Sequence, residues 1–135
     1  MNKQRTTLRA TASFWNSSLE EREEICNGIG PAGWPEGLRN LFNKPWLTYG
    51  VSFVPAADIH DWDYAKGTTK EDKRIADKRF YHNCKVLVYK HTSWWKILLL
   101  LKRLERAKEF YLAVKFGGKK AYWAGKIKQG QIDVF

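Results

Sequence analysis

The segment His60-Asp61-Trp62-Asp63-Tyr64 holds the residues of this sequence that are best suited to chemistry. Neighbouring residues on a helix diverge by about 100°, whereas residues four apart share a face. On a helix, His60 and Tyr64 would therefore face the same way, with Asp61 to one side. Because an imidazole exchanges its proton near neutral pH, this arrangement is typical of general acid–base chemistry.

A second carboxylate follows in the segment Ala76-Asp77-Lys78-Arg79-Phe80. If both segments are helices that run antiparallel, Asp77 lies alongside the middle of the first. Its carboxylate can then accept the distal ring proton of His60, which fixes the tautomer of His60 for work as a general base. The sequence therefore predicts that His60 and Asp77 act as a pair.

Asp61 has a different predicted role, as a ligand for a metal ion. Calcium takes oxygen ligands from carboxylates and backbone carbonyls together. Upstream, the segment from Cys26 to Pro35 is too rich in Gly and Pro for regular structure, so its carbonyls can point inward. Asp61 and the carbonyls of residues 27–33 therefore predict a calcium site. An ion held there would polarise an ester carbonyl while His60 draws a proton from an attacking water.

Two helices must position these residues. Pro55 suits the first turn of a helix because its missing N–H costs nothing there, and helix-forming residues continue until Gly67 ends the helix. Thr68 followed three residues later by Glu71 is typical of a capping box, which predicts a second helix running toward Val86. The connection between the two helices is so short that they must be antiparallel neighbours.

The rest of the chain predicts further elements. Residues 19–25 have a charged, helical character, residues 38–42 fit a short helix, and residues 46–49 fit an extended piece. From Trp94 to about Phe116, large apolar residues recur at helical spacing and predict a third helix that Gly117-Gly118 stops.

Composition limits the class of protein. A chain of 135 residues fits one domain and can bury a core without disulfides. With 24 Lys and Arg against 14 Asp and Glu, its charge of +10 attracts polyanions, either nucleic acid or a membrane rich in anionic lipid. Two cysteines, Cys26 and Cys84, are too few for a disulfide framework, and we expect reduced thiols.

The N-terminal segment indicates where the protein is made. It is basic but has no apolar stretch behind it, so we expect no signal peptide and a protein that is cytoplasmic when made, with virion or membrane association as later alternatives. The strongest apolar run, Ile97 to Leu101, is far shorter than the roughly 20 residues that span a bilayer. Residues 1–17 are polar and predict a flexible basic arm, and residues 18–135 predict a single domain.

Three segments together resemble the calcium-dependent phospholipase A2 superfamily, particularly its disulfide-poor bacterial and viral, phage-like members. Cys26-Asn27-Gly28-Ile29-Gly30-Pro31 is similar to the Gly-rich calcium loop of that family, Phe53 to Tyr64 to its His-Asp-x-x-Tyr helix, and Ala76-Asp77-x-x-Phe80 to its second catalytic helix. The likeness covers roughly residues 26–84, and Ala57 stands where many relatives have a half-cystine.

The resemblance implies a mainly α fold with two antiparallel catalytic helices, a Gly-rich calcium loop and an additional amphipathic helix. It also implies that the protein hydrolyses the sn-2 ester of phosphoglycerides at a membrane surface, and the basic charge favours anionic lipid. The residues that it would assign are the general base, its two hydrogen-bonded supports, and the calcium ligands: His60, Asp77, Tyr64, Asp61, Asn27, Gly28 and Gly30.

The third predicted helix has two interpretations. Its aromatic and apolar residues stand beside basic ones, a combination typical of a helix that lies in a membrane interface: Trp94, Trp95, Lys96, Lys102, Arg103 and Arg106. The favoured alternative is a helix that packs on the catalytic pair, with lysines at its margin extending to water. Both can hold in part, because an enzyme that cleaves lipid must meet a bilayer.

Other classes fit the sequence less well. The chief rival is a catalytically silent phospholipase-like module of viral or phage origin that binds a membrane or a protein partner. Nucleic acid is disfavoured because no recognised binding motif is present. A metal-dependent phosphohydrolase needs a histidine upstream of His60, which is the first in the chain, and the spacing of His82, Cys84 and His91 matches no structural zinc site.

Overall fold

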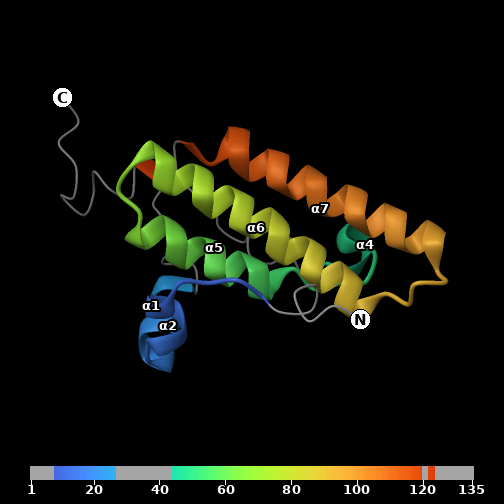
Figure 1. The fold of residues 1–135 in the computed structure, drawn as a ribbon, viewed down its shortest axis with the longest axis horizontal. Helices are drawn as coiled ribbons and strands as arrows, with labels where there is room; N and C mark the ends of the chain where they lie inside the picture. The colour runs from blue at the N-terminus through green and yellow to red at the C-terminus, as the bar shows by residue number, and fades with distance from the viewer. Residues whose placement is uncertain (1–7, 27–43, 120–121, 124–135) are drawn as a thin grey trace.

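The computed structural model describes residues 8–26, 44–119 and 122–123. These ranges form helices and contain no strand, which confirms the mainly α prediction. Figure 1 shows the helices in chain order: α1 (Ala12–Asn16), α2 (Leu19–Cys26), α4 (Pro45–Thr48), α5 (Val54–Lys66), α6 (Lys70–His91) and α7 (Ile97–Gly117). None of the helices in these ranges is long and apolar enough to cross a membrane.

The three long helices lie side by side, with α6 between α5 and α7 (Figure 1). Residues 67–69 join α5 to α6, and residues 92–96 join α6 to α7, so neighbouring helices run antiparallel. α5 and α6 are therefore antiparallel neighbours, as the short connection between them predicted. α2 packs against α5 on the side away from α7, and α4 lies near the end where α6 turns into α7.

A hydrophobic core fills the space between α5, α6 and α7. The large side chains of the core come from α6 and from the segment just before α5. They meet small residues on α5 and α7, among them Ala56 and Ala107, which are both fully buried. Cys84 is a free thiol within this core, and burial raises its pKa. The buried members are Val51, Phe53, Ala56, Ala57, Phe80, Cys84, Leu87, Val88, Ala107 and Val114.

α5 begins and ends where the sequence predicts. Pro55 lies in its first turn, and the N–H of Gly67, just past its end, donates to the carbonyl of Asp63 at 2.8 Å. α6 is also present, but its capping box is one residue later than predicted, at Thr69 and Asp72. Asp72, whose side chain is shorter than that of Glu71, accepts with its carboxylate from the N–H groups of Thr68 at 2.9 Å and Thr69 at 3.2 Å. Glu71 pairs instead with Arg74.

Residues 8–17 were expected to form part of a flexible arm, but the structure packs them against α5 and α6. Phe14 is buried with its ring 5.7 Å from that of Trp62, whose indole N–H donates to Ser13 Oγ at 3.1 Å. Asn83 exchanges two hydrogen bonds with the backbone of Arg9, at 2.7 and 2.8 Å. Apolar anchors within the polar segment account for the difference. Residues 1–7 lie outside the described ranges.

Two other predictions about local structure differ from the outcome. Residues 46–49 are not extended, because Pro45 starts the helical turn α4, and Tyr49 ends it with a left-handed backbone at φ 57°. The third long helix begins at Ile97 rather than Trp94. The helix predicted for residues 38–42 lies outside the described ranges.

The face that α7 presents to the core also differs from the predicted stripe. Leu100, Leu104 and Phe110 pack against the core cluster. By contrast, Ile97, Leu98 and Leu101 are more than half exposed. The favoured interpretation, a helix packed on its neighbours, therefore holds for one face of α7 and not for the apolar residues at its start.

Candidate active site

His60 and Asp77 lie side by side in the interior, at the contact between α5 and α6. His60 Nε2 is 2.8 Å from Asp77 Oδ1, and each residue is only 3% exposed. The antiparallel packing of the two helices brings the middle of α5 next to the first half of α6, as the sequence predicted. Because an ionised carboxylate can only accept, the hydrogen bond between His60 and Asp77 is donated by Nε2–H, and Nδ1 is the ring nitrogen that faces away from Asp77.

Tyr64 supports the same carboxylate from the next turn of α5. Its hydroxyl donates to Asp77 Oδ1 at 2.7 Å, and its ring centroid is 4.1 Å from that of His60. The two side chains therefore share a face, as their spacing predicted. Burial and the negative charge of Asp77 raise the pKa of Tyr64 far above its ordinary value. Tyr64 thus stays protonated and acts as a hydrogen-bond donor.

Lys73 is a third donor to Asp77, and the sequence analysis did not identify it. Its ammonium group lies 2.7 Å from Asp77 Oδ2, one turn away on α6, and 3.2 Å from the carbonyl oxygen of Lys115 in the last turn of α7. The spacing of four residues between Lys73 and Asp77 is a signal that could have found it. Through Lys73, the end of α7 is connected to the buried carboxylate.

The electrostatics of Asp77 favour a carboxylate rather than a neutral acid. Burial by itself would raise the pKa of Asp77. The hydrogen bond and charge of His60, with the hydrogen bonds of Lys73 and Tyr64, outweigh that effect and hold the pKa below its ordinary value of 3.8. Asp77 is therefore charged at neutral pH, as its predicted role as the partner of His60 requires.

Aromatic rings enclose the pair. The ring of His60 packs at 5.0 Å from that of Phe80, and Tyr122 packs against Tyr64 at 5.0 Å between ring centroids. Tyr122 also donates from its hydroxyl to the carbonyl of Thr69 at 2.7 Å, and burial raises its pKa to about 12. Tyr122 comes from a tail with no periodic pattern, so sequence reasoning had no signal for it.

The two acidic residues of the His-Asp-Trp-Asp-Tyr segment, Asp63 and Asp61, differ in their surroundings. Asp63 is buried and pairs with Arg79 of α6 at 2.8 Å, while burial raises its pKa despite that partner. It therefore helps to join α5 to α6. Asp61 is half-buried and adjoins His60 in the chain.

Of the predicted calcium ligands, only Asp61 falls within the described ranges. A carboxylate is an oxygen donor of the kind that calcium prefers, so Asp61 fits the predicted role in its chemistry. Asn27, Gly28 and Gly30 lie outside the described ranges. Within those ranges, no three or more His, Cys, Asp and Glu side chains lie close enough together to hold a metal ion. His82, Cys84 and His91 are within those ranges and form no such group.

Comparison of the chain with protein-family models, with curated proteins and with solved structures gives no match.

Proposed function

We propose that the protein is a calcium-dependent phospholipid hydrolase that cleaves the sn-2 ester of phosphoglycerides at a membrane surface. The observation that supports this proposal best is the buried pair of His60 Nε2 and Asp77 Oδ1 at 2.8 Å. A histidine with one nitrogen committed to a carboxylate is suited to take a proton at its other nitrogen. The resemblance of the surrounding segments to phospholipase A2 supplies the class of substrate.

Each side chain of the candidate site has its own role in the proposed reaction. His60 takes a proton at Nδ1 from a water molecule whose oxygen attacks the ester carbonyl carbon, so no covalent intermediate forms. Asp77 stabilises the imidazolium that results, and Tyr64 and Lys73 hold Asp77 in place. When the carbon–oxygen bond to the glycerol breaks, His60 returns the proton to the departing oxygen. The products are a fatty acid and a lysophospholipid.

Calcium bound by Asp61 and by carbonyls of Asn27, Gly28 and Gly30 would supply positive charge to the oxygen of the ester carbonyl. Asp61→Asn keeps the size of the side chain and removes its charge. We expect this variant to unfold at the same denaturant concentration as the wild type and to show no calcium binding in a calorimetric titration. Unchanged calcium affinity would remove Asp61 from the ligand set.

The experiment that tests the proposal is fatty-acid release from mixed phosphatidylglycerol and phosphatidylethanolamine vesicles, with calcium or with a chelator. We expect release that needs both calcium and His60, so that His60→Gln is inactive. His82→Gln is a matched control, because His82 lies on α6 outside the site. If the folded wild type releases nothing, the rival interpretation, a silent module that binds a membrane or a protein partner, replaces this one.

A further inference from the structure

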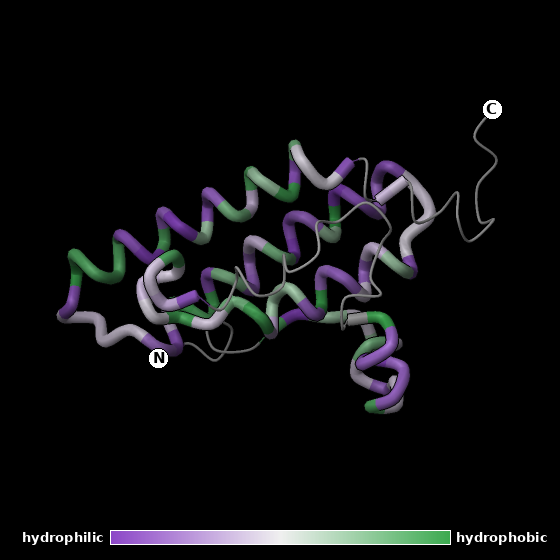
Figure 2. Tube along the Cα trace, turned by 180° about the vertical axis from the view of Figure 1, so that it is seen from behind, coloured by the Kyte–Doolittle hydropathy of each residue, from purple (hydrophilic) through white to green (hydrophobic). Residues whose placement is uncertain are grey.

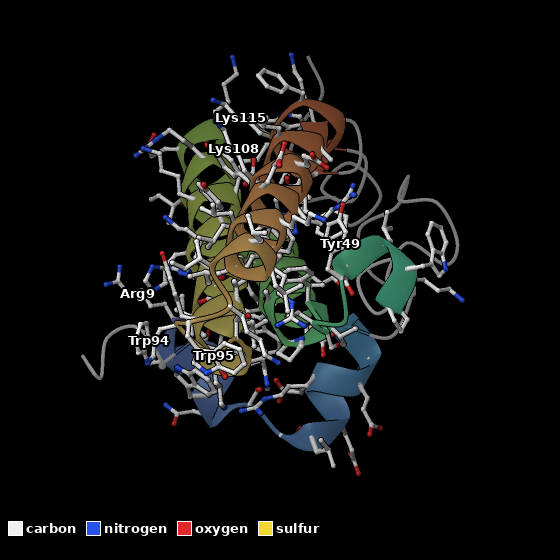
Figure 3. All side chains as sticks on the ribbon, turned by 90° about the vertical axis from the view of Figure 1, so that its right-hand side faces the viewer. Arg9, Tyr49, Trp94, Trp95, Lys108 and Lys115 are labelled. Atoms are coloured by element: carbon white, nitrogen blue, oxygen red, sulfur yellow. The ribbon has the colours of Figure 1, made fainter. Side chains whose placement is uncertain are left out.

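The end of the bundle where α6 turns into α7 carries a group of exposed apolar side chains, which we call the Trp corner. Figure 3 shows Trp94 and Trp95 together at this end, and the hydropathy colours of Figure 2 show that α7 begins with a hydrophobic stretch. Trp94 is 81% exposed, Leu98 78% and Trp95 63%. The members of the Trp corner are Trp94, Trp95, Ile97, Leu98 and Leu101.

The core does not need these side chains. Leu100 and Leu104 already pack α7 against the core cluster, so the Trp corner points away from it. Two tryptophans and three aliphatic side chains left together in water are unfavourable unless another surface covers them. The Trp corner is therefore suited to contact something outside the bundle.

Hydrogen bonds hold the turn in place. Arg103 of α7 donates to the carbonyl of His91 at 3.2 Å, to Thr92 Oγ1 at 2.8 Å and to the carbonyl of Tyr49 at 2.9 Å. The N–H of Lys96 donates to the carbonyl of Ser93 at 3.0 Å. The turn is thus tied to both long helices and to α4, so the two tryptophans are presented by an ordered segment.

Positive charge predominates around the Trp corner, and the first carboxylate on α7, that of Glu105, lies one turn beyond Leu101. Residues 78–104 contain no Asp or Glu, and Lys90, Lys96 and Lys102 are all exposed. The ammonium group of Lys96 lies 5.1 Å from the centre of a Trp95 ring, so a cation and an apolar ring occupy one small area. Tryptophan with neighbouring lysine is a combination that favours the boundary between lipid headgroups and acyl chains.

A groove of about 690 Å³ adjoins the two tryptophans, with Lys90 and Leu100 among its lining residues. Its lining combines apolar side chains with a cation. This pairing suits a partner that presents hydrocarbon next to negative charge. Anionic phospholipids have that chemistry.

We infer that the Trp corner docks the protein on a bilayer that contains anionic phospholipid, with Trp94 and Trp95 at the headgroup boundary and Lys90, Lys96 and Lys102 on the phosphates. The inference deepens the proposed function, on which it rests for the choice of lipid as the partner. Charge argues against a second copy of the chain, because pairing two corners would bring the same lysines together.

The test is cosedimentation with vesicles in the presence of a chelator, so that the lipid stays intact. We expect the wild type to bind phosphatidylglycerol-containing vesicles and to bind pure phosphatidylcholine at least about tenfold more weakly. Trp94→Ala/Trp95→Ala should lower binding to the anionic vesicles by about tenfold or more. Phe116→Ala is the matched control, because Phe116 is 74% exposed beside Lys115 at the other end of α7. It should bind as the wild type does.

Charge variants complete the test. Lys90→Gln/Lys96→Gln should weaken binding by roughly thirtyfold, about fivefold for each lysine near an anionic surface. Equal binding by the tryptophan variant and the wild type would overturn the inference. So would a wild-type dimer in sedimentation that the tryptophan variant dissociates, which would assign the Trp corner to a second copy. Hydrolysis of a short-chain, monomeric phospholipid by the wild type reports the proposed function separately.

Discussion

At the scale of single residues, Asp77 is the centre of the candidate site. One buried carboxylate accepts hydrogen bonds from His60, Tyr64 and Lys73, which lie 2.7 to 2.8 Å away. Three donors leave little freedom for the carboxylate to rotate, so the hydrogen bond that it accepts from His60 has a fixed direction. Such preorganisation removes a cost that a mobile base would meet in each turnover.

The first prediction concerns Lys73 as a positioning residue. Lys73→Met keeps the aliphatic stem and removes the hydrogen bond to Asp77 Oδ2. Because a hydrogen bond to a charged group contributes about 1.5–3 kcal/mol, we expect kcat to fall by about tenfold or more. KM should change little, because Lys73 does not reach the substrate in the proposed reaction.

Steady-state kinetics on a monomeric phospholipid checks this split between kcat and KM. Lys73→Arg retains a cation and should recover part of kcat, which a purely packing role would not explain. A variant with normal kcat and reduced thermal stability would show that Lys73 serves the fold alone.

A second prediction follows from the lowered pKa of Asp77. The folded protein binds this proton more weakly than the unfolded chain does. The carboxylate therefore stabilises the fold above its ordinary pKa of 3.8, and that contribution is lost as the pH falls through this value toward the lower folded pKa. Asp77→Asn cannot take up the proton, so its stability should depend less on pH in this range.

Urea unfolding of both proteins from about pH 6 to about pH 3 measures the difference. Near pH 6 the variant should be less stable by about 3 kcal/mol, because Lys73 loses its buried partner. The two curves should converge on acidification. Curves that stay parallel would show that Asp77 carries no linked proton.

The site shows which residues a sequence can reveal. His60, Tyr64 and Asp77 could be placed together because helical spacing and a short antiparallel connection decide their geometry. Their catalytic roles stay predictions. Lys73 had a usable signal in its spacing to Asp77, whereas Tyr122 reaches the site through tertiary packing, which local pattern does not encode. The predicted calcium loop lies outside the described ranges.

At the scale of the helices, the cap at the N-terminus of α6 decides where that helix begins and so where its site residues, Lys73 and Asp77, lie. Thr69 accepts from the N–H of Asp72 at 3.0 Å, and the carboxylate of Asp72 accepts from the N–H of Thr69. These bonds satisfy donors that the first turn leaves without helical partners. The cap sets the register that places Lys73 and Asp77 one and two turns later.

The third prediction uses the two adjacent threonines. Thr69→Ala should lower the free energy of unfolding by about 1 kcal/mol, because it removes the side chain that caps α6. Thr68→Ala should cost less than about 0.5 kcal/mol, since its hydroxyl is 3.4 Å from Asp72 and its N–H remains. Urea unfolding distinguishes them. A larger loss for Thr68→Ala would favour the cap that the sequence pattern indicated.

The helices also show where sequence reasoning failed. Pro55 and Gly67 bound α5 because their backbone preferences act locally. The predicted start of α7 was wrong. The spacing of Trp94 continues that of the helix, but the N–H of Lys96 bonds the carbonyl of Ser93 in a turn, and Arg103 bonds the two residues before that turn, His91 and Thr92. Periodicity therefore indicated an apolar stripe, but not which of its members would reach the core.

At the scale of the whole molecule, charge is unevenly distributed. The net charge is +10, yet α2 alone carries Glu20, Glu21, Glu23 and Glu24, whereas residues 78–104 have no acidic residue. α2 lies against α5, away from α7 (Figure 1). An anionic surface would therefore attract the α6–α7 side and repel the region of α2, which orients the protein before any apolar contact forms.

The last prediction tests that orientation through salt. Raising the salt concentration from about 0.05 M to about 0.5 M shortens the distance over which charges act to a few ångströms, so long-range attraction to an anionic bilayer fades. We expect hydrolysis of phosphatidylglycerol-containing vesicles to slow by about tenfold or more. Hydrolysis of a monomeric, zwitterionic short-chain phospholipid should change by less than about twofold, because the buried pair of His60 and Asp77 is shielded from solvent ions. Parallel assays of both substrates over the salt range provide the measurement. Equal slowing of both would place the salt effect in the chemistry and remove the role of the basic surface.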